Sequence, residues 1–329
     1  MHSPDSQPVF APSNVLAMLL VLVLWAGALL LPVPEQDWPL KVAVGLWPGA
    51  EPWVLAHEHG ELDTARVRLV EINWTSAAMR AVGNRVVDAA ILSLDEVLLQ
   101  VRQGYPLKVI MVTDISRGAD VVLVKPGIAS VADLRGRRVG FEPRTAGSRL
   151  LGRALAGSGL GLLDIQPVVL NATETQEAFD NLPIDAIVCT EPWPRRLGGL
   201  RAIYDSSQKG AEVVRVLAAH VEVLEEHRAA LKDLVLSHRR WAGRLREGEG
   251  TLGPVLRREG VTQEDFLRTL EKIEMPSLEQ SRLWLSGQDA WLSELFQKLQ
   301  EEAPGQDVPE TRILTPEEVF DPSILEEMS

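Results

Sequence analysis

The sequence predicts an α/β protein with two lobes, mainly parallel sheets and a ligand cleft between the lobes. Strand-like and helix-like runs alternate from residue 40 to 113, and a second alternating series follows from about residue 120 to 204. Such βαβ series give parallel sheets. Beyond about residue 221 the pattern is helical throughout, which predicts helices packed on the first lobe. Two chain crossings, near 118–120 and 209–214, would make a hinged clamp.

These patterns divide the 329 residues into four segments. We expect a signal peptide or N-terminal membrane anchor at 1–37 and the first part of lobe 1 at 38–119. Lobe 2 would occupy 120–212. The return strand, C-terminal helices and tail at 213–329 would belong to lobe 1 again.

Each element has its own local signal. In the first series, apolar runs predict strands at Lys41–Leu46, Val67–Ile72, Asp88–Leu92 and Leu107–Thr113. The helices between them are expected at Glu51–Glu58, Ser76–Val82 and Leu94–Arg102. In the second series, strands are expected at Val121–Lys125, Arg138–Phe141, Gln166–Leu170, Asp185–Thr190 and Ala202–Tyr204, and helices at Ser148–Leu155 and Glu174–Phe179. Ser130 and Asp133 form a capping-box pattern that opens a short helix. The remaining elements are a return strand at Val213–Ala218 and helices at Val223–Arg244, Gly250–Glu259, Thr262–Ile273 and Leu278–Leu299, before an extended tail from Ala303.

The N-terminal segment has the features of an export signal. Val15–Leu31 is uncharged, and Ala26-Gly27-Ala28 offers a small-residue cleavage pattern. Residues 1–14 contain no Lys or Arg, so the positive region of a signal peptide is missing. We expect cleavage after Ala28, with an uncleaved inner-membrane anchor as the alternative, and in either case a periplasmic location.

Composition excludes several function classes. The net charge of −13 argues against nucleic acid and against anionic membrane surfaces, both of which need clustered Lys and Arg. The single cysteine, Cys189, cannot form an internal disulfide and reads as a small buried hydrophobe. No Cys/His spacing typical of zinc sites occurs, and His57 and His59 face different ways on a helix. We therefore expect no metal and no cofactor.

The first candidate ligand residues follow the first and third strands. Trp47, Pro48 and Gly49 stand where the first strand ends and a helix begins, which is where open α/β sheets bind ligands. Ser93 and Asp95 stand at the corresponding point after the third strand. Ser93 is either an N-cap or a hydroxyl that meets the ligand, and both roles can coexist.

The first crossing supplies a second group. Its members are Asp114, Gly118, Ala119 and Asp120. The two carboxylates could accept hydrogen bonds from a donor-rich ligand, although Asp and Gly also favour turns for structural reasons alone.

The second lobe supplies the third group. Thr145, Gly147 and Ser148 open a helix whose free N–H groups could hold an anion. Glu191 precedes a proline at a helix start, which explains it structurally, and it could also face the cleft. Trp193 would project near the cleft and could contact a cation.

These segments together resemble a known family. The similarity lies in LWPGAEPWVLAHEHG at 46–60, VDAAILSLDEVLL at 87–99, DISRGADVVLVKPGIASVADLRGRRVGFE at 114–142, DAIVCTEPW at 185–193 and FDPSILEE at 320–327. This ordered set resembles the substrate-binding proteins of ABC importers for nitrate, sulfonate and taurine, which share their fold with thiamine-precursor binding proteins. The resemblance implies a two-lobed type II periplasmic binding protein whose cleft loops line the ligand site. It also implies a small-molecule ligand and an inner-membrane permease as partners.

The chain departs from parts of that pattern. It lacks the lipid-modified cysteine that follows the leader in Gram-positive members, which favours a Gram-negative periplasmic protein or one anchored by a helix. It also lacks the cysteine-rich motif and histidine of yeast-type pyrimidine-precursor synthases, which share the fold.

The interpretation is therefore a monomeric extracytoplasmic solute-binding protein that closes around its ligand and catalyses no reaction. Alternatives are a membrane-anchored sensor or ligand-handover protein, and a biosynthetic enzyme on the same fold. The resemblance suggests an oxyanion such as a sulfonate as ligand. The carboxylates proposed for the cleft, with Arg144 as the main nearby base, favour an amine or zwitterion clasped by Trp47 and Trp193.

Overall fold

A computed structural model of the chain describes residues 18, 20–22, 38–170, 183–197, 199–247, 252–301 and 312–328. The chain divides into two units, Met1–Trp38 and Pro39–Ser329. In the first unit, Met18 and Leu20–Leu22 are helical and exposed, and the rest of the predicted leader lies outside the described residues. Within the described ranges, no helix combines the length and the apolar character that crossing a bilayer requires.

Lobe 1 is built on a six-stranded sheet in the order β11-β4-β10-β3-β1-β2. The strands are β1 (Leu40–Val44), β2 (Val67–Glu71), β3 (Ala89–Ser93), β4 (Leu107–Ser116), β10 (Val213–His220) and β11 (Ile273–Glu274). β1 pairs in parallel with β2 and β3, as the βαβ pattern predicts. The helices that connect this series are α2 (Glu51–Glu58), α3 (Thr75–Gly83) and α4 (Leu94–Arg102). Each helix therefore begins at the edge of the sheet where the parallel strands end.

The return strand β10 changes the character of this sheet. It lies between β3 and β4 and runs antiparallel to both, and β11 also pairs antiparallel with β4. The sheets are therefore mixed rather than mainly parallel as the sequence pattern predicts. The reason is that β4 leaves lobe 1 and β10 returns to it, so these two strands run in opposite directions side by side.

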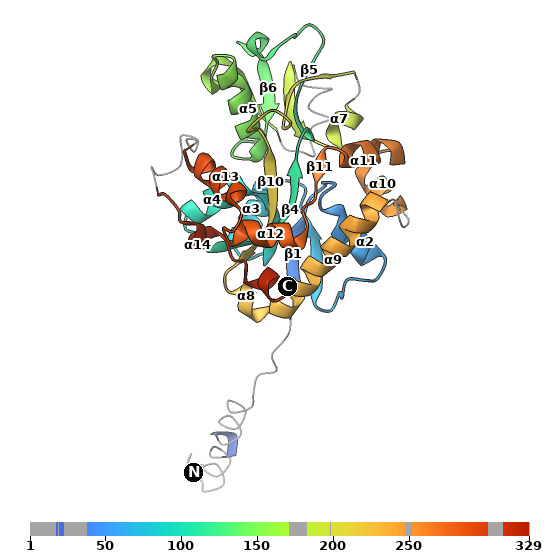
Figure 1. Ribbon diagram of the computed structural model, residues 1–329, viewed down its shortest axis with the longest axis vertical. Helices are drawn as coiled ribbons and strands as arrows, with labels where there is room; N and C mark the ends of the chain where they lie inside the picture. The colour runs from blue at the N-terminus through green and yellow to red at the C-terminus, as the bar shows by residue number, and fades with distance from the viewer. Residues whose placement is uncertain are drawn as a thin grey trace, which may run out of the picture. The chain divides into compact units, whose positions relative to one another are not determined.

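Lobe 2 has a five-stranded sheet in the order β7-β6-β8-β5-β9. The strands are β5 (Asp120–Val124), β6 (Arg138–Phe141), β7 (Gln166–Val169), β8 (Ala186–Thr190) and β9 (Arg201–Asp205). β6 is parallel to β7 and β8, and β5 is antiparallel to β8 and β9. Two apolar clusters, one of them packed around α5 (Ala146–Gly157), form the core of this lobe. A two-lobed α/β fold is thus confirmed (Figure 1).

Short elements of lobe 2 are also placed. The predicted capping box of Ser130 and Asp133 opens the one-turn helix η1 (Val131–Leu134), which confirms that prediction. A second single turn, η2 (Leu162–Asp164), precedes β7, and α7 (Trp193–Arg196) follows β8. The helix expected at Glu174–Phe179 lies outside the described residues.

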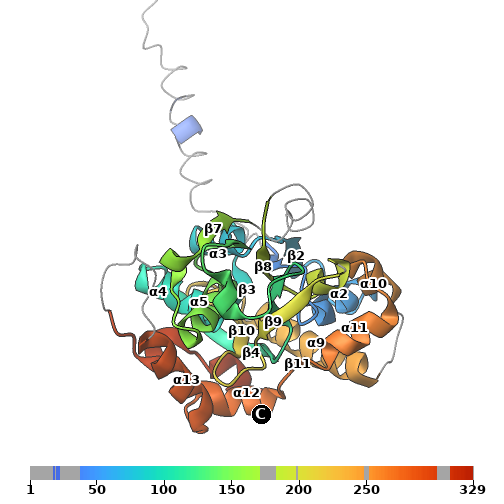
Figure 2. The same cartoon turned by 90° about the horizontal axis from the view of Figure 1, so that it is seen from above.

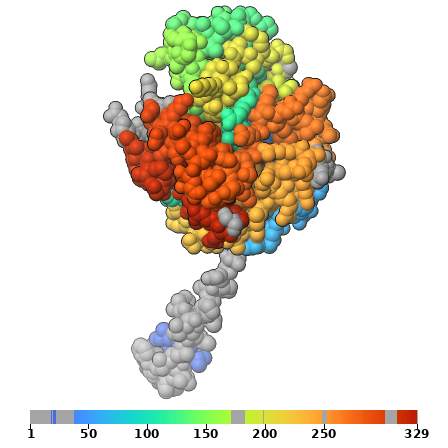
Figure 3. Space-filling view, viewed as in Figure 1, coloured from blue at the N-terminus to red at the C-terminus, as the bar shows by residue number. Residues whose placement is uncertain are grey.

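The chain after β10 completes lobe 1 and, apart from β11, is mainly helical, as expected. The helices are α8 (Val223–Glu226), α9 (Arg228–Glu247), α10 (Gly253–Glu259), α11 (Gln263–Leu270), α12 (Leu278–Leu285), α13 (Ala290–Glu301), α14 (Pro316–Val319) and α15 (Ser323–Glu326). Their buried side chains form one continuous core with those of the lobe 1 sheet. The expectation of an extended tail from Ala303 is wrong in its described part, where two one-turn helices, α14 and α15, occur. Seen from above, α10 and α11 lie on one side of lobe 1 and α13 lies on the other (Figure 2). The space-filling view shows these orange and red helices beneath the green and yellow surface of lobe 2 (Figure 3).

Two predicted helices are divided in the structure. The run Val223–Arg244 forms α8 and α9, which are separated at His227. The run Leu278–Leu299 forms two helices, α12 and α13, because Gly287 adopts a left-handed φ of 71° between them. The apolar pattern continues through the break, which is why it reads as a single helix in the sequence.

Two chain crossings join the lobes, between β4 and β5 and between β9 and β10. They are hydrogen-bonded to each other: Ser116 Oγ lies 2.8 Å from Ser206 Oγ, and the Gly118 N–H donates to Ser206 Oγ at 2.7 Å. Gly118 has a φ of 114°, a conformation that side chains with a Cβ rarely adopt. The hinge is therefore a paired, buried junction.

Candidate functional site

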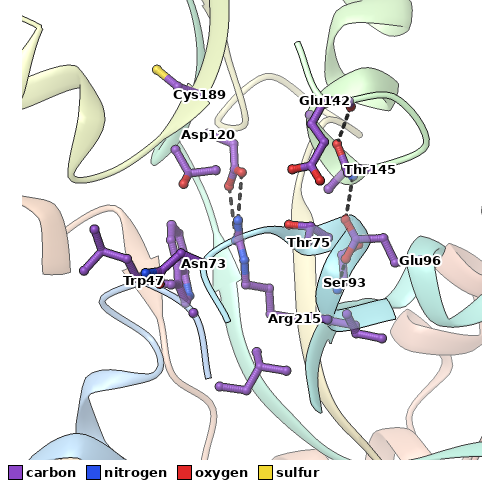
Figure 4. A pocket seen from close by; sticks show the side chains of 18 of the residues that line it. Trp47, Asn73, Thr75, Ser93, Glu96, Asp120, Glu142, Thr145, Cys189 and Arg215 are labelled. Atoms are coloured by element: carbon purple, nitrogen blue, oxygen red, sulfur yellow. Dashed lines mark hydrogen bonds and ion pairs between the residues drawn. The ribbon is translucent and has the colours of Figure 1, made fainter. Parts of the chain in front are cut away.

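A cleft of about 160 Å³ lies between the lobes. Its polar lining comes from strand ends and helix starts of both lobes, as Figure 4 shows. Its apolar walls carry Leu46, Trp47 and Ile72 of lobe 1 and Phe141, Leu170, Ile187 and Trp193 of lobe 2. Such an apolar space with a few convergent polar groups is typical of small-molecule sites.

The turn after β1 forms one wall of the cleft. Trp47 is buried, and its indole N–H donates to Oδ1 of Asp114 at 3.1 Å. Gly49 makes this contact possible, since a Cβ there would stand 2.2 Å from Oδ2 of Asp114. The Gly49 carbonyl oxygen lies 3.0 Å from Nε2 of His238 on α9, and burial lowers the pKa of His238 to about 4. The turn is thus anchored to the core of lobe 1.

Arg215 on β10 joins the wall to the hinge. Its guanidinium donates two hydrogen bonds to Asp120 at the start of β5, with distances of 2.8 and 3.2 Å. Its Cζ lies 3.5 Å from the centroid of the Trp47 ring, a cation–π contact. Asp114 is also near, and burial raises its pKa to about 6 although Arg215 opposes the shift. The guanidinium therefore balances buried carboxylates of both lobes.

Glu96 connects α4 of lobe 1 to the beginning of α5 in lobe 2. Its Oε2 accepts the Ser93 N–H at 2.8 Å, which is one half of a capping box. Its Oε1 accepts the Ala146 N–H across the cleft at 2.9 Å. Burial, and secondarily the charge of Asp95, raise the pKa of Glu96 to about 7. A carboxyl group from one lobe thus caps the first turn of a helix in the other.

Glu142 makes the reciprocal contact. It follows β6 in lobe 2, and its Oε1 accepts the Ser76 N–H in the first turn of α3 at 2.8 Å. Figure 4 shows its carboxylate projecting from lobe 2 into the space between the lobes. Helix N-termini hold free N–H groups and a partial positive charge, so a carboxylate is well placed there.

Further cross-lobe bonds surround the cleft. Asp95 of α4 pairs with Arg149 of α5 at 3.2 Å. Glu191, fully buried at the end of β8, pairs with Nζ of Lys272 at 3.1 Å. Arg196 of α7 donates to the Glu259 carbonyl oxygen of α10 at 2.8 Å. The structure is therefore a closed arrangement of the lobes.

The structure brings some of the predicted site residues together and leaves others outside the cleft. Lining residues are Trp47, Ser93, Asp120, Thr145, Gly147 and Trp193. Eight other predicted site residues do not line the cleft in the described part of the chain: Pro48, Gly49, Asp95, Asp114, Gly118, Ala119, Ser148 and Glu191. Most of these residues contact a lining residue or the hinge. Asp114 accepts the indole N–H of Trp47, and Gly49 leaves room for that contact. Gly118 and Ala119 lie in the hinge, and Ser148 caps α5 together with Thr145. Glu191 was expected to face the ligand, but its carboxylate is buried against Lys272.

Sequence reasoning missed six polar lining residues: Asn73, Thr75, Glu96, Glu142, Thr190 and Arg215. Arg215 had a usable signal, since a single charge inside an apolar strand implies a buried partner. Glu96 had another, because it completes the capping box that Ser93 begins, yet that pattern indicates only a local role.

Cys189 lies in the cleft wall, and burial raises the pKa of its thiol well above the ordinary value, with Glu191 and Asp120 adding to the shift. The thiol is therefore protonated at neutral pH. In the described part of the chain, no group of three or more His, Cys, Asp or Glu residues is arranged to hold a metal ion.

Comparison with known proteins agrees with this architecture. The model of the family described as "NMT1/THI5 like" matches residues 62–233, more than half of the chain. The chain belongs to the NMT1/THI5-like family. A relative in Escherichia coli (strain K12), named "Putative aliphatic sulfonates-binding protein", is 27% identical over 184 residues. That match covers 53% of this chain and 58% of the relative, so less than two thirds of the relative's length is represented.

Solved structures of two binding proteins share the fold. The alkanesulfonate-binding protein SsuA from Xanthomonas axonopodis pv. citri, bound to MOPS, aligns with a TM-score of 0.67 and 19% identity over 86% of this chain and 99% of that one. The periplasmic nitrate-binding protein NrtA from Synechocystis PCC 6803 aligns with a TM-score of 0.64 and 12% identity over 90% and 89%. At these identities the similarity shows a shared fold only. The ligand has to be inferred from the residues that line the cleft.

Proposed function

We propose that this protein is the solute-binding component of an ABC-type importer and that it holds a small organic solute between its lobes. The cleft carries the proposal, because its lining comes from both lobes and cross-lobe bonds surround it. Lobes that meet at a paired hinge can open and close as a clamp. Membership in the NMT1/THI5-like family and the names of the sulfonate- and nitrate-binding relatives support the same function.

The lining favours binding over catalysis. Within the described residues it contains no histidine, and its single thiol, Cys189, is kept protonated by burial. A thiol is a nucleophile only as the thiolate. The named relatives are binding proteins, which makes an enzyme on the same fold the weaker candidate.

We also propose that the protein is exported and works in the periplasm beside an inner-membrane permease. The uncharged segment Val15–Leu31 and the Ala26-Gly27-Ala28 pattern motivate the proposal. Cell fractionation followed by N-terminal sequencing tests it: a mature chain beginning after Ala28 supports cleavage, and an intact Met1 in the membrane fraction supports the anchor. A cytosolic protein would contradict both versions.

A thermal-shift screen with nitrate, alkanesulfonates, amines and amino acids tests solute binding, because a ligand that binds only the folded state raises the melting temperature. For each solute that binds, small-angle X-ray scattering with and without the solute tests whether the lobes close around it.

We expect a smaller radius of gyration when the protein is saturated with solute, or an unchanged radius of gyration where the free protein is already closed. In the latter case, Asp95→Asn, which removes the pair with Arg149, should open the free protein and restore the ligand-induced compaction. A protein that binds no solute of the library, or expands on binding, would contradict the proposal.

The permease partnership separates an importer component from a sensor. We expect the liganded protein to stimulate ATP hydrolysis by the complete ABC importer in vesicles, and the ligand-free protein to do so less. Absence of stimulation by a protein that demonstrably binds ligand would favour the sensor or handover alternative.

A further inference from the structure

The charges of the cleft lining are unevenly balanced. Three carboxylates line it, on Glu96, Asp120 and Glu142, against one guanidinium, on Arg215. Arg215 and Asp120 neutralise each other through two hydrogen bonds. Glu96 and Glu142 have no cationic side chain as ion-pair partner within the described ranges, and each is hydrogen-bonded instead to backbone N–H groups. The lining thus has an excess of negative charge.

The two helix N-termini at the cleft are already occupied. The first turns of α3 and α5 line the cleft, and the backbone N–H groups of such turns ordinarily attract oxyanions. Here Glu142 accepts from Ser76 in α3, and Glu96 accepts from Ala146 in α5. An oxyanion at either position would have to displace a carboxylate of the protein or lie beside it. Because both charges would share a closed cleft with little water, their repulsion would be strong.

We infer that the cleft binds a small organic amine whose ammonium group meets Glu142, and that Glu96 and Glu142 together exclude oxyanions; this rests on the proposed solute-binding function. Glu142 uses Oε1 for Ser76, is half-buried and projects into the cleft, so its second oxygen is placed for a ligand. A hydrogen bond from an ammonium to a carboxylate is charge-assisted and stronger than a neutral one. The carbon body of the amine would lie against Phe141 and Trp193.

Matched pairs of probes test the sign of the charge directly. Butylamine and butane-1-sulfonate have the same carbon chain, as do phenethylamine and 2-phenylethanesulfonate. Calorimetric titration of the full chain is done at pH 8, because burial raises the pKa of Glu96 to about 7 and a higher pH favours its charged form. We expect at least one amine to bind more than tenfold tighter than its sulfonate.

Two variants identify the residues responsible. Glu142→Gln retains an oxygen for the Ser76 N–H and removes the charge, and it should weaken amine binding at least tenfold. The double variant Glu96→Gln with Glu142→Gln should bind the sulfonates tighter than the parent does. Glu264→Gln on α11, an exposed carboxylate paired with Arg268 outside the cleft lining, is the matched control and should change neither affinity by more than twofold.

The contrary outcomes are distinct. A parent protein that binds a sulfonate tighter than its amine would overturn the amine assignment and leave the solute-binding function standing. The same holds if Glu142→Gln binds amines as the parent does. If none of the four probes binds, the assignment fails, and the broader solute screen decides separately whether the protein is a solute-binding protein at all.

Discussion

The guanidinium of Arg215 lies over the indole ring of Trp47, with its Cζ 3.5 Å from the ring centroid. The same guanidinium binds Asp120 at the first residue of β5. One side chain on the return strand therefore links the β1 turn of lobe 1 to the strand that enters lobe 2. This contact couples the shape of the cleft wall to the position of the hinge.

Removing the Arg215 charge should destabilise the protein. Arg215→Met leaves Asp120 buried without a partner, and loss of one member of a buried ion pair typically costs about 3–5 kcal/mol. We expect a decrease of about 3 kcal/mol in the free energy of unfolding in urea. The double variant Arg215→Met with Asp120→Asn should recover part of it, because no uncompensated charge remains at that position. A single variant as stable as the parent would show that the pair contributes little.

The turn after Trp47 should not accept a side chain at Gly49. A Cβ there would lie 2.2 Å from Oδ2 of Asp114 and 2.4 Å from Nε1 of Trp47, so Gly49→Ala must displace both. Such overpacking typically costs about 1–3 kcal/mol. Gly152→Ala is the control: this helical glycine has open space around its Cβ position and should gain up to about 1 kcal/mol. Equal effects in the two variants, measured by denaturant unfolding, would refute the close contact.

Both cleft tryptophans should contribute to ligand binding and to stability, since each side chain is buried in the core of its lobe. Trp193 lines the cleft from lobe 2, and Trp193→Ala should lower the melting temperature and weaken ligand binding by about 2 kcal/mol or more, as expected for an aromatic anchor. Trp47→Ala should likewise weaken binding and lower the melting temperature, because it removes the donor to Asp114 and the ring beneath Arg215. Trp38→Ala, at an exposed position, should change neither quantity. Titration calorimetry and thermal unfolding measure the two effects separately, and unchanged binding in both cleft variants would place the ligand elsewhere.

Stability should fall as the pH rises from 5 to 8. The folded state raises the pKa of Glu96 from its ordinary 4.5 to about 7, and those of Glu259 to about 7 and Asp114 to about 6. The folded protein then binds protons that the unfolded chain has released. The stabilisation that these protonated carboxyl groups give is therefore fully present below their pKa values in the unfolded chain. It is lost as the pH rises through their pKa values in the folded protein. His238 has the opposite effect, because burial lowers its pKa to about 4 and the unfolded chain then binds the proton more readily than the folded protein. This group makes stability rise with pH, but only below about pH 6.5.

Glu96→Gln isolates one of these groups. We expect its free energy of unfolding to fall less steeply between pH 5 and 7 than that of the parent, by up to about 1.4 kcal/mol per pH unit. The exposed control Glu264→Gln should keep the parent slope. Urea unfolding at pH 5, 6, 7 and 8 measures the slopes, and parallel curves for Glu96→Gln and the parent would contradict the raised pKa.

The sequence predicts the framework of this site well and its electrostatics poorly. Trp47, Ser93 and Trp193 could be found because they follow strands whose ends the pattern marks, and such strand ends meet at one edge of a sheet. Glu96 and Glu142 could not, because their role depends on which helix of the opposite lobe each meets when the lobes close. Glu191 lies directly after a strand, as the sequence predicts, but its carboxylate does not face the cleft. It is paired with Lys272, which lies 81 residues later in the chain and gives no local signal near Glu191.

The position of β10 has a consequence for how the chain acquires its structure during synthesis. Lobe 2 is one continuous stretch of chain, whereas the sheet of lobe 1 has β10 between β3 and β4. The position between β3 and β4 therefore stays unoccupied until β10, which ends at His220, has been synthesised. Before that point β3 and β4 expose unpaired edges, which are prone to wrong pairing. The residues of the second lobe are therefore synthesised before the sheet of the first lobe can be completed, and domains generally fold as units in order of emergence.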